Sequence, residues 1–98
     1  MSDKRYSIIV DRLDRCIICG SYLGVEKHET EFGTANRELS IKYGLVVPLC
    51  YRHHRGTYGV HGREGDKLNK KLKEQGQKAF EYHYPDLNYK DIFGQNRL

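Results

Sequence analysis

The chain has 98 residues, of which 38% are hydrophobic and 31% are charged, with a formal net charge of +4 at pH 7. A chain of this size can bury only a modest core, so we expect one domain over residues 1–98. No run of about 18 apolar residues could span a membrane, and residues 1–5 lack the apolar region of a signal peptide. We therefore expect a cytoplasmic protein whose thiols stay reduced, with no membrane partner.

The first half of the chain predicts short strands joined by polar segments. Residues 6–10 are rich in β-branched and aromatic side chains and predict a strand or an extended lead-in. Residues 25–29 and 45–49 predict two further strands, and Pro48 restricts the second of these to an edge or to its end. The polar stretch between them predicts a loop with one helical turn at residues 38–43.

The second half predicts an amphipathic helix over residues 66–82, with its lysines facing water. The positions expected to face the core recur at steps of three and four residues: Leu68, Leu72, Gln75, Ala79, Phe80 and His83. Pro85 ends this helix. The tail over residues 86–98 has no clear period, and we expect its last residues to be loose.

Three cysteines and one histidine form two pairs with the same spacing. Cys16 and Cys19 are separated by two residues, as are Cys50 and His53. A disulfide would leave one of the three thiols over, whereas a closed Zn²⁺ site accepts three thiolates and one imidazole. The pattern therefore predicts a structural zinc site, which a chain this small needs to supplement its core.

A second group of residues has the donors for another metal ion. His54 follows the predicted zinc ligand directly, and the strand segment reads Glu26-Lys27-His28-Glu29. These side chains could bind a divalent ion that keeps open positions for water and phosphate, with an unbound His or Glu taking a proton from the water. His61 is a third possible ligand, a phosphate contact or a loop residue. Hydrogen bonding or packing alone is the alternative for each of them.

Positive charge is concentrated near the start of the predicted helix. Residues 63–78 hold six basic and three acidic side chains, an excess that would attract phosphate, although a solvated helix face is the alternative. The candidate contacts to nucleic acid are Arg37, Arg63, Lys67, Lys70 and Lys71.

The order of these motifs resembles the HNH endonucleases of the ββα-metal (His-Me finger) group, particularly small phage members with a structural zinc. The likeness rests on the two Cys/His pairs, on the acidic and histidine residues of the first strand, and on the adjacent His53 and His54. Three further segments also match: residues 33–37, 43–50 and 59–62. The resemblance covers about residues 16–77.

The resemblance implies an α+β fold in which two strands and a helix hold one catalytic ion, followed here by a C-terminal amphipathic helix. It implies hydrolysis of phosphodiester bonds in DNA, with Zn²⁺ as structural ion and Mg²⁺ or another divalent ion as catalytic ion. It also implies a phage or prophage protein in a bacterial host. An activating phage or host recombination protein is a further candidate partner.

By position, His54 matches the last HNH histidine, which binds the catalytic ion. The segment Glu26-Lys27-His28-Glu29 stands where many members have an acidic residue, a spacer and two histidines. Either His28 is the general base and Glu29 a ligand or orienting residue, or Glu29 occupies the position of the base. Residues 44–46 contain no counterpart of the central asparagine, which Asn36 replaces from the loop. The resemblance thus implies ion ligands His54, Glu26, His28 and His61, and catalytic residues His28, Glu29, His54 and Asn36.

A second function fits the same sequence: a zinc-stabilised module that binds DNA or protein and has a degraded active site. Metal stoichiometry separates the two functions. One tightly bound zinc favours the binding module, and a second, weaker divalent site favours the nuclease.

Overall fold

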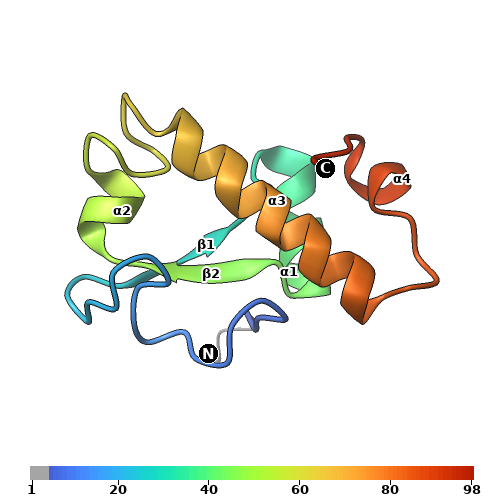
Figure 1. Cartoon of the computed structure of the whole chain (residues 1–98), viewed down its shortest axis with the longest axis horizontal. Coiled ribbons are helices and arrows are strands. Elements are labelled where there is room, and N and C mark those ends of the chain that lie inside the picture. The colour runs from blue at the N-terminus through green and yellow to red at the C-terminus, as the bar shows by residue number, and fades with distance from the viewer. Residues whose placement is uncertain (1–4) are drawn as a thin grey trace.

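A computed structural model describes residues 5–98 and has an α+β architecture (Figure 1). Residues 1–4 lie outside the described residues. They include most of the segment in which the sequence predicts no signal peptide. The elements in chain order are β1 (Glu26–Glu29), α1 (Thr34–Tyr43), β2 (Val46–Leu49), α2 (Tyr51–Arg55), α3 (Asp66–His83) and α4 (Tyr89–Phe93). The α+β class predicted from the sequence is confirmed.

The two strands form an antiparallel sheet with α1 in the connection between them. Glu26 pairs with Leu49 at one end, and Glu29 pairs with Val46 at the other. Both strands of a two-stranded sheet are edge strands, so Pro48 lies where a missing N–H is tolerated, as predicted. Helix α2 begins two residues after β2 ends, which places its histidines beside the strands.

Two predictions for the first half need correction: the strand, which was one of two forms predicted for residues 6–10, and the length of the helical segment. Residues 6–10 form no strand, because the Ser7 hydroxyl accepts hydrogen bonds from the N–H groups of Ile9 and Val10 and bends the backbone. The predicted single turn is the end of the ten-residue helix α1. This helix ends at Tyr43 and is capped by Gly44, which has a φ of 76° and whose N–H bonds to carbonyls of the last turn.

Most of the buried apolar residues form two clusters. In the first cluster Leu72 of α3 packs with Val47 and Leu49 of β2. In the second, Phe80 of α3 packs with Leu45 and with residues of α4. Helix α3 therefore crosses the sheet diagonally and joins both clusters (Figure 1).

The apolar stripe of α3 is shifted slightly from its predicted position. Leu72 and Phe80 are buried as expected, and so are Gly76 and Gln77. Leu68 and Ala79 are half-buried, whereas Gln75 and His83 are exposed. Four of the predicted lysines are exposed, but Lys73 is half-buried, with its ammonium 4.8 Å from the centroid of the Phe32 ring.

The C-terminal tail is held in place, contrary to the prediction that its last residues are loose. Arg97 forms two hydrogen bonds of 2.8 Å with the carboxylate of Glu31, which is 1% exposed. The Tyr89 hydroxyl donates to the same carboxylate, and Gln77 accepts from the Arg97 N–H. A buried carboxylate next to β1 thereby fixes both α4 and the end of the chain.

Among residues 5–98, no helix is long and apolar enough to cross a membrane.

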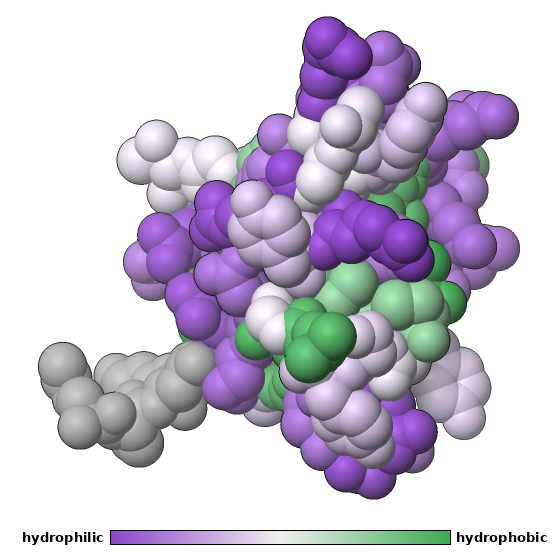
Figure 2. Space-filling model, turned by 90° about the vertical axis from the view of Figure 1, so that its left-hand side faces the viewer, coloured by the Kyte–Doolittle hydropathy of each residue, from purple (hydrophilic) through white to green (hydrophobic). Residues whose placement is uncertain are grey.

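The end of the molecule that carries α2 is mostly hydrophilic and has a small apolar area (Figure 2). Ile18 and Leu23, in the segment that contains the first cysteine pair, are exposed large apolar side chains.

Candidate functional site

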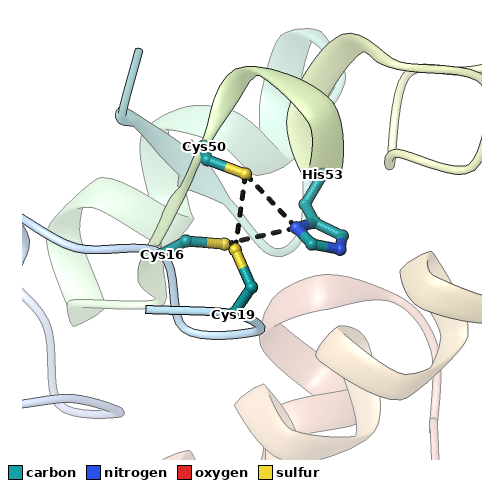
Figure 3. A group of neighbouring side chains, drawn as sticks. All are labelled: Cys16, Cys19, Cys50 and His53. Carbon is teal, nitrogen blue, oxygen red and sulfur yellow. Dashed lines mark hydrogen bonds between the residues drawn. The ribbon is translucent and has the colours of Figure 1, made fainter. Parts of the chain in front are cut away.

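The two Cys/His pairs meet at one point between the segment before β1 and the start of α2 (Figure 3). The three sulfur atoms and one ring nitrogen of this group lie within 4.8 Å of one another. The Cys/His centre consists of Cys16, Cys19, Cys50 and His53. The sequence predicted this grouping.

The separations in the Cys/His centre fit a tetrahedral ion. The sulfurs of Cys19 and Cys50 are 3.8 Å apart, and Nδ1 of His53 is 3.3 Å from the Cys50 sulfur and 3.6 Å from the Cys16 sulfur. A Zn²⁺ ion with Zn–S bonds of about 2.3 Å and a Zn–N bond of about 2.0 Å requires edges of roughly 3.5–3.8 Å. The four side chains can therefore hold a metal ion such as zinc with little movement.

Backbone groups around Cys16 favour its thiolate form. Burial raises the pKa of this thiol, but hydrogen bonds from the backbone N–H groups of Cys50, Cys19 and Ile18 outweigh burial, and the net pKa is lowered. A thiolate is the form that binds a metal ion. The chemistry of the donors thus agrees with their geometry.

A second group of possible ligands includes the next residue of α2, His54. His28 of β1, His54 of α2 and His61 of the following loop each offer a ring nitrogen within 4.8 Å of those of the other two. Their ring centroids are 4.8–5.3 Å apart. We call these three residues the histidine cluster. The sequence predicted all three as candidates, and the structure brings them together.

His54 is oriented by a carboxylate. Its Nδ1 lies 2.8 Å from Oε1 of Glu26, which also accepts a hydrogen bond from Nε of Arg55. Arg55 and His54 lower the pKa of Glu26 to about 2, so this carboxyl group is ionised at neutral pH. If the His54 proton is on Nδ1, Nε2 is a lone-pair donor, which is the usual arrangement around a metal-bound histidine. The side chains whose donor atoms converge are those of His28, His54 and His61. Glu26 is not one of them and contacts the cluster through His54.

His28 has a buried donor atom with no partner. Its Nε2 is inaccessible to solvent and forms no hydrogen bond, and the residue is only 3% exposed. Burial, together with electrostatic interactions with His54, His61 and Lys73, lowers the pKa of His28 to about 3. The ring is thus neutral at pH 7. An unpartnered buried nitrogen is costly, and a bound ion would satisfy it.

His61 reaches the cluster because of a tight turn. Its backbone N–H donates to the His54 carbonyl, and Gly62 passes so close to Gly56 that an added Cβ would lie 1.8 Å from the Gly56 carbonyl oxygen. Only glycine fits at this crossing. Burial first, and then the charges of His54 and Arg55, lower the pKa of His61, which also favours its neutral form.

The histidine cluster opens into a polar cleft of about 700 Å³. Four basic residues line this cleft along with the cluster: Arg5, Lys27, Arg37 and Arg55. Glu26, Glu29 and the ring of Phe32 complete most of the wall. The cleft has room for a phosphodiester group, and its cations exceed its carboxylates.

The other predicted residues are distributed as follows. Glu29 lines the cleft but forms ion pairs with Arg5 and Arg37. The side-chain amide of Asn36 lies 3.5 Å from the Phe93 carbonyl oxygen, and Asn36 is not among the residues that line the cleft. Four predicted nucleic-acid contacts are exposed around the start of α3, outside the cleft: Arg63, Lys67, Lys70 and Lys71.

Six residues of the cleft were not predicted as site residues from the sequence: Arg5, Val25, Lys27, Phe32, Gly33 and Arg55. Arg55 follows His54 directly, so its position in α2 was available as a signal. Arg5 and Phe32 lie in segments without a chemical motif, and only the folded arrangement brings them to the cleft. Comparison with family models, curated proteins and solved structures finds no match for this chain.

Proposed function

We propose that this protein is a metal-dependent endonuclease that hydrolyses phosphodiester bonds in DNA at the histidine cluster. The observation that carries the proposal is the convergence of three imidazoles, one with an unpartnered buried Nε2, in a cleft with a cationic rim. The separate Cys/His centre supports a structural metal ion. The resemblance to HNH endonucleases agrees with both assignments.

The donors of the histidine cluster favour a transition-metal ion over Mg²⁺. Imidazole nitrogen suits Zn²⁺, Ni²⁺ and similar ions, whereas Mg²⁺ prefers carboxylate oxygens and water. The nearest carboxylate, that of Glu26, is bonded to His54 and Arg55. We therefore expect the active protein to use a borderline ion such as Zn²⁺ or Ni²⁺.

Each part of the cleft has a role in this reaction. His28, His54 and His61 would hold the ion, and Glu26 would keep the His54 ring in the binding orientation. A bound ion would polarise the phosphate and lower the pKa of a coordinated water molecule. The arginines of the rim would orient the DNA backbone.

The direct test is nicking of supercoiled plasmid by the full chain with Zn²⁺, Mn²⁺, Ni²⁺, Mg²⁺ or no added ion. His28→Ala and His54→Ala should each reduce cleavage by about 10³-fold or more, since each removes a ligand of the ion. Both variants should lose one equivalent of bound metal and keep the ion of the Cys/His centre. His83→Ala is a matched control, because His83 is exposed and outside the cleft.

Two outcomes would contradict the proposal. A wild-type protein that is inert with every ion and every DNA form, yet binds DNA, would favour the zinc-stabilised binding module. A His54→Ala protein that loses the structural ion and unfolds would show that His54 belongs to the Cys/His centre.

A further inference from the structure

The wall of the cleft contains a second carboxylate, that of Glu29, which lies between two arginines. Oε1 of Glu29 is 3.0 Å from Nε of Arg37, and Oε2 is 3.1 Å from Nε of Arg5. The three residues come from the end of β1, the first half of α1 and the segment before β1. Glu29 is 8% exposed, so this group is fixed in the wall of the cleft.

This arrangement is poorly suited to a general base. A base at Glu29 needs an oxygen that water can reach. Oε1 of Glu29 is paired with Arg37, and Oε2 lies 3.1 Å from Arg5 and is inaccessible to solvent, although it accepts no hydrogen bond. Protonation would also remove the charge that attracts the two arginines. The same contacts are well suited to holding the arginines in place.

Arg37 retains the groups that bind phosphate. Its ion pair with Glu29 joins Nε to Oε1, and among the described residues no hydrogen bond is formed by its two Nη groups. The Arg37 side chain is 55% exposed and lines the same cleft as the histidine cluster. A guanidinium group held in one orientation can bind two phosphate oxygens at once.

We propose that Glu29 is a positioning residue that holds Arg37 and Arg5 as a phosphate-binding site for the DNA backbone beside the histidine cluster. The proposal rests on the proposed function for its substrate, and it assigns Glu29 a role other than proton transfer. Glu26 repeats the arrangement, since it contacts both Arg55 and His54. Each carboxylate of the cleft thus orients a cation.

Phosphate binding can be tested without any cleavage. In an NMR titration of the full chain with inorganic phosphate and then with a short DNA duplex, the Nε–H signal of Arg37 should shift. Glu29→Gln should broaden this signal. Glu29→Gln and Arg37→Gln should each weaken duplex binding about tenfold, because a charge-assisted contact is lost. Asp14→Asn is the matched control, since Asp14 pairs with Arg12 outside the cleft. An Arg37 signal that neither ligand moves would overturn the proposal.

Kinetics of plasmid cleavage then separate positioning from proton transfer. Glu29→Gln and Arg37→Gln should each raise KM about tenfold and leave kcat within about twofold. The effect of the double variant should be smaller than the product of the two single effects, because Glu29 acts partly through Arg37. A fall in kcat of about 100-fold or more in Glu29→Gln would identify Glu29 as the general base and overturn the proposal. If the wild type cuts no DNA, the proposed function fails, and the phosphate titration still decides this inference.

Discussion

Glu31 shows how one residue can organise a large part of this small fold. Its carboxylate is buried beside β1 and bonded to Arg97 and Tyr89, so it joins the strand to the last residues of the chain. Burying a charge is costly, and the two charge-assisted bonds from Arg97 offset that cost. The pair is therefore sensitive to the loss of either partner.

This pairing predicts a specific pH dependence of stability. Burial raises the pKa of Glu31, but the hydrogen bonds from Arg97 and Tyr89 outweigh burial and lower the net pKa below its ordinary value of 4.5. A carboxyl group whose pKa is lowered by folding stabilises the protein fully above pH 4.5, and this contribution is lost as the pH falls through the lower, folded value.

Glu31→Gln should reduce the free energy of unfolding by about 3 kcal/mol at pH 7, because it leaves the Arg97 charge uncompensated. Urea unfolding between pH 7 and pH 3 should show a smaller acid loss in this variant than in the wild type. Glu38→Gln, at an exposed position of α1, is the control and should follow the wild-type profile. Parallel profiles for all three proteins would show that the Glu31 pair contributes no acid sensitivity.

At the scale of the elements, α3 joins the core to the surface beside the cleft. Leu72 packs on β2, and Lys73 lies over the ring of Phe32, which lines the cleft. Lys70 and Lys71 are exposed on the same half of the helix. DNA in the cleft would therefore pass within reach of these lysines.

We expect Lys70→Glu combined with Lys71→Glu to weaken DNA binding. The slope of log K against log[salt] should become less steep by about 2, one unit for each lost phosphate contact. Fluorescence anisotropy at several salt concentrations measures both quantities. The control is Lys78→Glu combined with Lys90→Glu, which changes the net charge equally at two exposed positions nearer α4. This control should lose less affinity for DNA. Equal losses for the two pairs would indicate a response to net charge alone.

Residue spacing predicted the elements and sites that depend on local pattern. The Cys/His centre follows from two pairs with equal spacing, and the β1 and β2 strands follow from short β-branched runs. Only the last part of helix α1 was predicted, as a turn at residues 38–43, because the helix has no continuous apolar face and depends on packing. Helix α4 was missed, although Asn88 as N-cap and Gly94 at the C-terminal end were a readable signal.

Contacts between distant residues were beyond prediction from spacing. No pattern in the sequence links Glu31 with Arg97, or Glu29 with Arg5, because these pairs form only when the chain ends pack on β1. The histidine cluster is an intermediate case. His54 was predicted from its position next to a zinc ligand, while the location of His61 depends on the close crossing at Gly62.

At the scale of the whole molecule, the Cys/His centre closes the N-terminal segment onto the core. Residues 5–25 contain no helix or strand, and they attach to β2 partly through the hydrogen bond from the Ile17 N–H to the Pro48 carbonyl. Cys16 and Cys50 are 2% and 5% exposed and belong to the first core cluster. Emptying the centre would leave thiolates buried in an apolar core, so metal binding and folding should be coupled.

We therefore expect Cys50→Ser to release the structural ion and to lower the melting temperature by more than about 10 °C, since each kcal/mol lost lowers Tm by roughly 4–8 °C in a domain of this size. Metal content by atomic emission and thermal unfolding by circular dichroism measure the two effects. Arg52→Ala is the matched control, because Arg52 is exposed between two ligands of the same centre. Unchanged metal content and Tm in Cys50→Ser would mean that the centre has a different ligand set. Loss of the ion with an unchanged Tm would mean that the two core clusters, rather than the metal, hold the N-terminal segment in place.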